Sequence, residues 1–127
     1  MYSHVMVGTD DITTSKNFYD KLLGVLGYNE GIIDDKGRCF YIDKRGVFSV
    51  TKPIDGNAAS CANGGTIGFL ASSPTQVDEW HSMGLEHGGI ECEEPPGVRE
   101  NVFGKLYVAY LRDPYGNKIC ALHRMAT

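Results

Sequence analysis

Five side chains in this sequence could bind or transform a small molecule: His4, Arg38, Tyr110, Arg112 and Cys120. An unperturbed histidine titrates near neutrality, so His4 could be a general base or a ligand anchor. Cys120 would be a nucleophile if a nearby base lowered the pKa of its thiol. The two arginines can hold a carboxylate or phosphate through paired hydrogen bonds. The hydroxyl of Tyr110 could orient a ligand.

Each of these residues also has a purely structural interpretation. His4 could be a hydrogen-bonded strand histidine, and Cys120 could be a buried, inert thiol. Arg38 and Arg112 could be solvated charges at strand ends, and this interpretation is favoured more for Arg112 because it lies next to a turn. Tyr110 could be a core aromatic residue whose hydroxyl is satisfied. Residue type alone therefore leaves the role of each side chain open.

The elements that must position these residues centre on the stretch 107–123. It reads as two strands joined by Asp113-Pro114-Tyr115-Gly116, with proline suited to a type I turn and glycine to a left-handed bulge. A similar pattern occurs at 40–50, where Asp43 and Gly46 precede Asp113 and Gly116 by 70 positions. The recurrence indicates one structural unit used twice.

The rest of the chain supports this duplication. In the first half we expect a strand at 3–8, a helix from Ile12 to about Leu26 capped by Asp11, and a hairpin of strands 38–42 and 47–51. In the second half we expect a strand at 66–71, a helix from the Ser73 cap to about His87, a short strand at 90–93 and a hairpin of strands 105–113 and 117–123. Residues 94–104 are predicted to be an irregular loop able to cover a binding site.

This pattern predicts an α+β fold of duplicated βαβββ modules within a single domain, 1–127. Module one is 1–51, the linker is 52–65 and module two is 66–127. The net charge of −4 argues against nucleic-acid binding, and no apolar run is long enough to cross a membrane. The four cysteines lack CxxC spacing and no export signal is evident, so we expect free thiols and a cytoplasmic protein.

The duplicated unit, the HVMV start, the FY pair on the first helix and the DPYGNK turn resemble the vicinal oxygen chelate superfamily, which includes glyoxalase I, bleomycin resistance proteins and extradiol dioxygenases. The resemblance covers nearly the whole chain. It implies a cup-shaped mixed sheet with helices on the outside, a metal and a substrate inside the cup, and a homodimer.

The same resemblance places the metal ligands at four equivalent positions, which here hold His4, Val50, Thr66 and Cys120. Valine cannot bind a metal, and a threonine hydroxyl is a poor ligand. Catalytic zinc sites normally use three protein ligands. We therefore expect no metal or other cofactor at these positions; the alternative is a divergent metal-dependent lyase or dioxygenase that uses His4.

Strand alternation predicts which side chains face the cup, with Tyr110 opposite Cys120, Arg112 opposite Lys118, Phe40 opposite Val50 and Ile42 opposite Phe48. The predicted cup residues are His4, Met6, Arg38, Phe40, Phe48, Val50, Thr66, Val108, Tyr110, Arg112, Cys120 and Leu122. This is an apolar wall with a few polar groups, which is the usual composition of a small-molecule site.

The sequence thus predicts a glyoxalase-like or bleomycin-resistance-like protein that binds a small, partly apolar and anionic molecule. The expected ligand-binding residues are His4, Arg38, Phe40, Thr66, Tyr110, Arg112 and Cys120, with His4 and Cys120 as the candidate catalytic residues. Whether the protein is an enzyme or a non-catalytic binder stays open. Arg38 is expected to contact the anionic group, so replacing it with alanine should weaken binding by about 1.5–3 kcal/mol.

Overall fold

The computed structural model describes residues 1–126. Along the chain its elements are β1 (His4–Gly8), α1 (Ile12–Val25), β2 (Ile32–Ile33), β3 (Cys39–Asp43), β4 (Gly46–Thr51), β5 (Ile67–Leu70), α2 (Pro74–Glu86), β6 (Ile90–Glu91), β7 (Gly97–Asn101), β8 (Gly104–Arg112) and β9 (Lys118–Arg124).

Both helices begin where side chains satisfy their first backbone N–H groups. Oδ1 of Asp11 accepts hydrogen bonds from the backbone N–H groups of Thr13 and Thr14. At α2, Oγ of Ser73 accepts from the backbone N–H of Gln76, and Pro74 stands in the first turn. The predicted starts of both helices are confirmed. Neither helix within residues 1–126 has the length and apolar character needed to cross a membrane.

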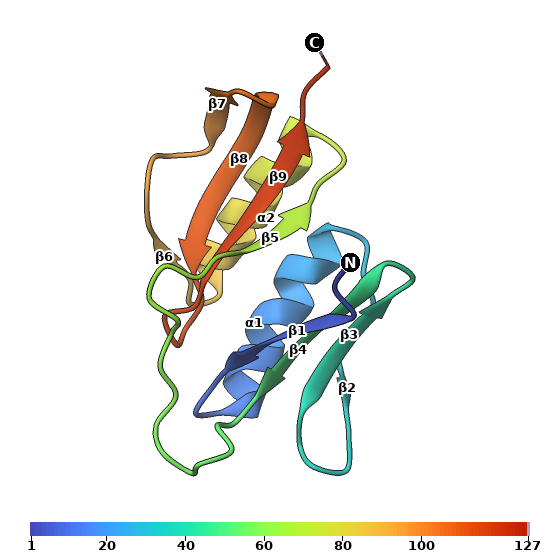
Figure 1. Ribbon diagram of the computed structural model, residues 1–127, viewed down its shortest axis with the longest axis vertical. Helices are drawn as coiled ribbons and strands as arrows, with labels where there is room; N and C mark the ends of the chain where they lie inside the picture. Colours follow the sequence, from blue (N-terminus) through green and yellow to red (C-terminus); the bar gives the residue numbers. More distant parts are fainter. Residues whose placement is uncertain (127) are drawn as a thin grey trace.

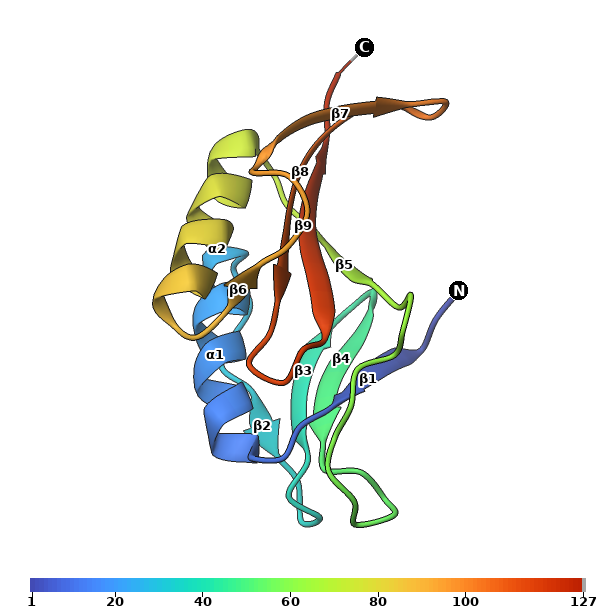
Figure 2. The same cartoon turned by 90° about the vertical axis from the view of Figure 1, so that its left-hand side faces the viewer.

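The strands form two mixed sheets that share one helical layer. One sheet has the order β1-β4-β3-β2, and the other has the order β5-β9-β8-β6, with β7 also paired to β8. β1 pairs with β4 in parallel, and β5 pairs with β9 in parallel. Both helices lie on the same side of the two sheets (Figures 1 and 2). The predicted α+β fold with helices outside open sheets is confirmed. We call the sheet surfaces that face away from the helices the open side.

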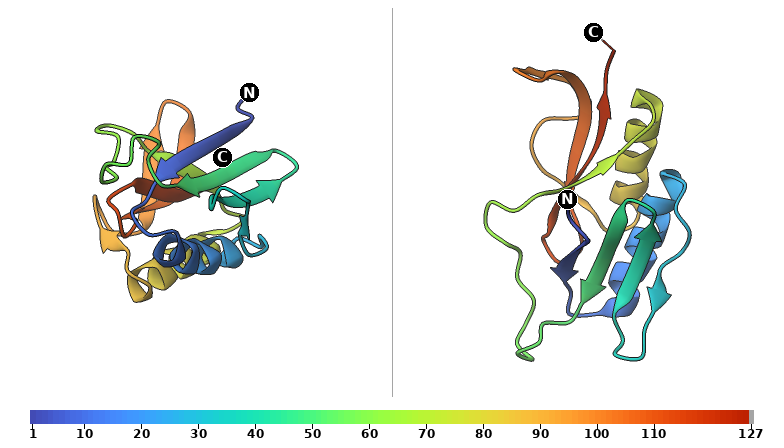
Figure 3. Two further views of the ribbon diagram at one scale, coloured as in Figure 1. Left: turned by 90° about the horizontal axis from the view of Figure 1, so that it is seen from below. Right: turned by 45° about the vertical axis from the view of Figure 1, so that its right-hand side comes forward.

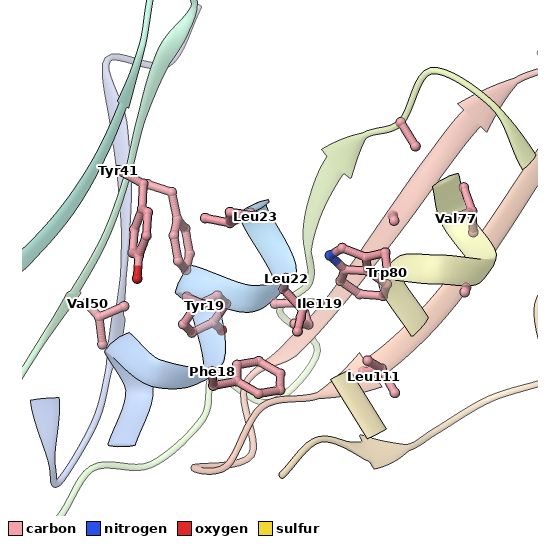
Figure 4. Close-up of a cluster of buried hydrophobic side chains, with 14 of the residues drawn as sticks. Phe18, Tyr19, Leu22, Leu23, Tyr41, Val50, Val77, Trp80, Leu111 and Ile119 are labelled. Carbon is pink, nitrogen blue, oxygen red and sulfur yellow. The ribbon is translucent and has the colours of Figure 1, made fainter. Parts of the chain in front are cut away.

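A continuous apolar core connects the two sheets through the helices. Phe18, Tyr19, Leu22 and Leu23 of α1 and Trp80 of α2 are each 1% exposed or less. Figure 4 shows these side chains between the residues of the first sheet and those of the second. The strands contribute alternate residues to this core: Val5 and Val7 from β1, Ala109 and Leu111 from β8, and Ile119 and Ala121 from β9. Their neighbours in each strand therefore face the open side.

The turn between β8 and β9 also connects the two halves of the chain. The backbone N–H of Gly116 donates to the carbonyl of Asp113 at 3.0 Å, and Gly116 has a φ of +88°. The buried Asp113 carboxylate accepts from the hydroxyl of Tyr19 in α1 at 2.6 Å. Nδ2 of Asn117 donates to the carbonyl of Gly8 at 2.9 Å. The predicted bulged turn is confirmed, and it is also a contact between the sheets.

The second hairpin has the predicted register, but the register predicted for the first hairpin is wrong. Tyr110 lies opposite Cys120, as predicted. In the first hairpin Asp43 pairs with Gly46 across a two-residue turn, one residue shorter than the turn between β8 and β9. Phe40 therefore pairs with Ser49 instead of Val50, and Ile42 pairs with Val47 instead of Phe48. Phe48 and Val50 consequently belong to the core and not to the cup wall.

The segment 94–104 is also more regular than predicted. Residues 97–101 form β7, an antiparallel partner of β8 in which Gly97 lies opposite Val108 and Asn101 opposite Gly104. The prediction of an irregular covering loop is therefore wrong for this part. The segment lacks the hydrophobic alternation of a half-buried strand because β7 is an edge strand with exposed Val98, Glu100 and Asn101.

Candidate functional site

An apolar pocket of about 260 Å³ lies where the two sheets meet. We call it the seam pocket. It is bounded by β1, the β3–β4 hairpin, β5 and the end of α1 (Figure 1). Its apolar lining includes Val5, Leu23, Val47, Phe48, Ile67 and Phe69. Val47 faces the open side and Phe48 faces the core, so the pocket penetrates between the sheets.

The polar side chains that line this pocket include His4, Asp43 and Arg45. His4 is exposed, and its Nδ1 shares a hydrogen bond with Oγ of Ser3 at 2.7 Å. Nε of Arg45 lies 3.4 Å from Oδ2 of Asp43, and the Arg45 side chain is 73% exposed. Such an exposed ion pair is weak and easily rearranged. The pocket therefore combines an apolar interior with an exposed imidazole and an exposed guanidinium, whose present contacts a ligand could replace.

A polar cluster on the open side of the second sheet lies close to the seam pocket. The Lys118 ammonium lies 4.9 Å from the centre of the Tyr110 ring and forms an ion pair with Glu93. Cys120 is 5% exposed, and burial raises the pKa of its thiol to about 11. A Cβ atom on Gly68 would lie 3.1 Å from the Cys120 sulfur, and Gly68 lines the seam pocket. Cys120 therefore stands directly behind one wall of the pocket.

Other predicted site residues have partners of their own elsewhere on the protein. Nη2 of Arg38 lies 2.6 Å from Oδ2 of Asp34, and the Arg38 guanidinium lies 5.4 Å from the centre of the Phe40 ring. Arg38 lines a separate, wide depression with Met6, Lys36 and Lys52. Nη1 of Arg112 donates to the carbonyl of Gly116 at 2.8 Å. Thr66 is exposed just before β5.

Comparison with known proteins assigns the fold to a family. Residues 2–121 match the glyoxalase/bleomycin resistance protein/dioxygenase superfamily. The chain belongs to this superfamily. A glyoxalase/bleomycin resistance protein from Albidiferax ferrireducens T118, known from a crystal structure, is 56% identical, with 98% of this chain and 99% of that chain covered and a TM-score of 0.94.

More distant structures share the fold. A virulence protein from Salmonella typhimurium is 22% identical over 98% of this chain and 97% of that chain, with a TM-score of 0.68. A lactoylglutathione lyase from Agrobacterium tumefaciens is 21% identical over 97% of this chain and 92% of that chain, with a TM-score of 0.65. No curated protein sequence matches the chain significantly.

The residues at the superfamily's metal positions do not fit a metal ion. With the corrected register, the open-side residue opposite Phe40 is Ser49, not Val50. Oγ of Ser49 donates to the carbonyl of Val5 at 2.9 Å. Burial raises the pKa of the Cys120 thiol to about 11, so a metal that binds there would have to displace the proton of a buried thiol. Within residues 1–126, no three His, Cys, Asp or Glu side chains are grouped to hold a metal.

Of the residues predicted from the superfamily resemblance, His4 lines the seam pocket, and Cys120 lies behind it. Arg45 and Asp43 also line the pocket, but neither was predicted from the sequence. Both belong to the tight β3–β4 turn, and Asp43 and Gly46 were interpreted only as turn residues. The parallel pairing of β1 with β4 places this turn beside the start of β1, and that long-range pairing cannot be read from the local sequence of the turn.

Proposed function

We propose that this protein binds a small molecule with an apolar body and one anionic group in the seam pocket, without a resident metal. The observation that carries the proposal is the pocket itself: an apolar cavity of about 260 Å³ lined also by His4 and Arg45. Small-molecule sites are typically apolar clefts in which a few polar groups set the orientation.

The apolar part of the ligand would lie against Leu23, Phe48 and Phe69. Burial of apolar surface contributes about 25 cal/mol per Å², so an aromatic or branched aliphatic body gives most of the binding energy. Gly68 adds no side chain to this wall. A Cβ atom there would lie close to the Cys120 sulfur, so glycine fits this position best.

The anionic group would lie at the polar end of the pocket. Arg45 could exchange its exposed contact with Asp43 for a carboxylate or phosphate of the ligand, because a guanidinium binds such groups through two hydrogen bonds. His4 would donate a further hydrogen bond. Arg38 stays a candidate for the anionic contact, although its guanidinium already pairs with Asp34.

The second candidate function is a divergent metal-dependent lyase or dioxygenase that uses His4. The donor set of His4, Ser49, Thr66 and Cys120 favours metal-free binding, because two of the four side chains are hydroxyls, which are poor ligands for a catalytic metal. Protein purified without chelator should contain well under one zinc, nickel, iron or manganese per chain by elemental mass spectrometry. Stoichiometric metal that is lost in His4→Ala would favour the metalloenzyme instead.

Two probes that differ only in charge test the proposal. Naphthylacetate and naphthylacetamide share an apolar body, but only the first carries a carboxylate. We expect calorimetry to show the acid binding about tenfold more tightly, which corresponds to about 1.4 kcal/mol. Equal affinities would show that the ligand charge is not recognised, and absence of binding by both probes would count against the pocket.

Two arginine variants then locate the contact. Arg45→Ala should remove the preference for the acid and leave the binding of the amide unchanged. Arg38→Ala is the matched control, because it removes the same charge from the separate depression. If Arg38→Ala removes the preference and Arg45→Ala does not, the anionic site lies beside Arg38 instead.

A further inference from the structure

A second pocket, of about 430 Å³, lies beside the seam pocket. We call it the basic pocket. It is bounded by the ends of α1, β5 and β9, the first turn of α2 and the turn between β3 and β4. The end of β5 (yellow-green), the β3–β4 turn (teal) and the end of α1 lie side by side in Figures 1 and 3. Tyr28, Arg45 and Leu70 line both pockets, so the two pockets share a wall.

The charged side chains of the basic pocket are all of one sign. Arg45 and Arg124 line it together with His123, and among the residues that the structure describes its lining contains no aspartate or glutamate. The chain as a whole carries a net charge of −4, so this positive charge is a local feature. A hollow lined by cations raises the local concentration of anions.

Both guanidiniums have hydrogen-bond donors that a ligand could use. Nε of Arg45 contacts Oδ2 of Asp43 at 3.4 Å, and within residues 1–126 neither Nη atom of Arg45 has a hydrogen-bond partner. Arg124 is exposed, and none of the ion pairs in the same part of the chain includes it. The fold therefore does not consume the charge of Arg124.

The other polar groups of the pocket bond to one another and hold its walls in place. Oε1 of Gln76 accepts from the backbone N–H of Ser72 at 2.6 Å and from its hydroxyl at 2.9 Å, and Nε2 of Gln76 donates to the carbonyl of Val25 at 3.0 Å. Nδ1 of His123 donates to the carbonyl of Ala71 at 3.1 Å. These bonds connect the ends of α1, β5 and β9 through α2. The two arginines are thus positioned by an ordered frame.

We propose that the basic pocket binds a phosphate group, with Arg45 and Arg124 as its charged contacts. A phosphate group carries a charge of about −1.5 to −2 at pH 7, which two guanidiniums can balance. The forked N–H groups of a guanidinium also match phosphate oxygens through paired hydrogen bonds. Phosphate binding does not depend on the function proposed above; only the link to the seam pocket through Arg45 rests on it.

Inorganic phosphate is the direct probe of this pocket. Titrated into the wild-type protein at about pH 7 and constant ionic strength, it should shift the side-chain NMR signals of Arg45 and Arg124 and saturate with a Kd of about 1 mM or below. Chloride at the same ionic strength should not shift them. Signals that do not move, or that still move without saturation at about 10 mM phosphate, would overturn the proposal.

Variants of one charge each locate the phosphate. Arg124→Ala should weaken phosphate binding about tenfold or more, because it removes charge-assisted hydrogen bonds. Arg124→Lys keeps the charge but not the fork, so it should recover only part of the affinity. Lys44→Ala is the matched control, because Lys44 is exposed beside Arg45 but lines neither pocket. If Lys44→Ala weakens binding as much as Arg124→Ala does, phosphate responds only to the general charge of this region and the proposed site fails.

Naphthyl phosphate distinguishes free phosphate from the phosphate of a larger ligand. If one ligand occupies both pockets, naphthyl phosphate should bind at least about tenfold more tightly than inorganic phosphate, because its apolar body is buried in the seam pocket. Equal affinities would leave the phosphate site in place and identify free phosphate as its ligand. In either case Arg124→Ala should weaken the binding of both probes.

The phosphate site and the function proposed above can fail separately. If inorganic phosphate binds through Arg124 but neither naphthylacetate nor naphthylacetamide binds, the proposed function fails and the phosphate site stands. If naphthylacetate binds through Arg45 but inorganic phosphate does not bind, the phosphate site fails and the proposed function stands.

Discussion

The carboxylate of Asp113 accepts four hydrogen bonds from three residues. Its Oδ1 accepts from the backbone N–H groups of Tyr115 and Asn117, and its Oδ2 accepts from Tyr19 and from Nδ2 of Asn117. It is 1% exposed. A buried carboxylate is tolerated only when it is fully hydrogen-bonded, so this turn residue stabilises both the hairpin and its contact with α1.

Tyr19→Phe should lower the free energy of unfolding by about 1.5–3 kcal/mol, because it removes a hydrogen bond to a buried charged group. Urea denaturation measures the change. Tyr107→Phe is the matched control, since the Tyr107 hydroxyl donates to Asp78 at an exposed position. We expect that control to change stability by no more than about 0.5 kcal/mol. Equal losses in both variants would show that burial of the bond does not matter.

The cysteines should differ in reactivity because their exposure differs. Cys61 is exposed, whereas Cys39 and Cys120 are buried, and burial raises the pKa of both buried thiols. The thiolate is the reactive species. Iodoacetamide added to the native protein at about pH 8 should therefore modify Cys61 first, as peptide mass spectrometry would show. Rapid modification of Cys120 under these conditions would contradict its buried, protonated state.

The raised pKa of Cys120 also makes stability depend on pH. Below the ordinary thiol pKa of 9.0, both the folded and the unfolded chain keep the proton. Between 9.0 and about 11 the unfolded chain loses the proton while the folded chain retains it. This contribution to stability is therefore lost as the pH rises through that range. Cys120→Ala should make the urea midpoint less sensitive to pH there.

At the scale of the elements, Gly84 lies inside α2 although glycine weakens a helix, and the close packing of α2 on β8 explains its presence. A Cβ at this position would lie 2.2 Å from Cδ1 of Leu111, so α2 can approach β8 closely only with glycine there. In α1, by contrast, a Cβ at Gly24 would meet no heavy atom within 4 Å. At Gly84 helix propensity favours alanine, whereas packing against Leu111 favours glycine. At Gly24 propensity favours alanine and packing does not oppose it.

Gly84→Ala should destabilise the protein by about 1–3 kcal/mol, because overpacking outweighs the gain in helix propensity. Gly24→Ala should stabilise it by about 0.5–1 kcal/mol, because only the propensity changes. Thermal and urea denaturation of both variants give the comparison. A stabilising Gly84→Ala would mean that Leu111 can move aside at little cost.

Element positions were predictable because local signals determine them, whereas the first hairpin register was not. The caps Asp11 and Ser73 and the Asp113 turn act over a few residues. The first hairpin turn is one residue shorter than the second, and this shift moves Val50 from the cup wall to the core. Sequence similarity between Asp43–Gly46 and Asp113–Gly116 concealed the shift, because both turns contain Asp and Gly at the same spacing.

At the scale of the whole molecule, the candidate site depends on how the two sheets meet. The seam pocket has walls from β1 and β5, which are not paired with each other. Position in a strand could predict that His4 faces the open side. Arg45 lies at the pocket because β4 pairs with β1 and β5 lies across from them, and strand alternation describes neither relation. The sequence therefore predicted the superfamily and two residues that line the pocket, His4 and Phe48, but not the pocket.

The shared core predicts that both halves of the molecule unfold together. α1 packs against α2, and Nε2 of Gln76 donates to the carbonyl of Val25 at 3.0 Å across that contact. The only tryptophan, Trp80, lies in α2, so its fluorescence reports on the second half. A core change in the first sheet should therefore shift the transition that Trp80 reports.

Val50→Ala provides this test, because Val50 is 0% exposed in β4 and lies far from Trp80 in sequence. Deleting its methyl groups should lower the free energy of unfolding by about 2 kcal/mol. In a single cooperative transition, Trp80 fluorescence and far-UV circular dichroism should both shift by this amount. Ile42→Ala, on the neighbouring strand and 67% exposed, is the control and should shift neither signal appreciably. If Val50→Ala leaves the Trp80 midpoint unchanged, the two halves unfold independently, and the contacts of Tyr19 and Gln76 do not couple them.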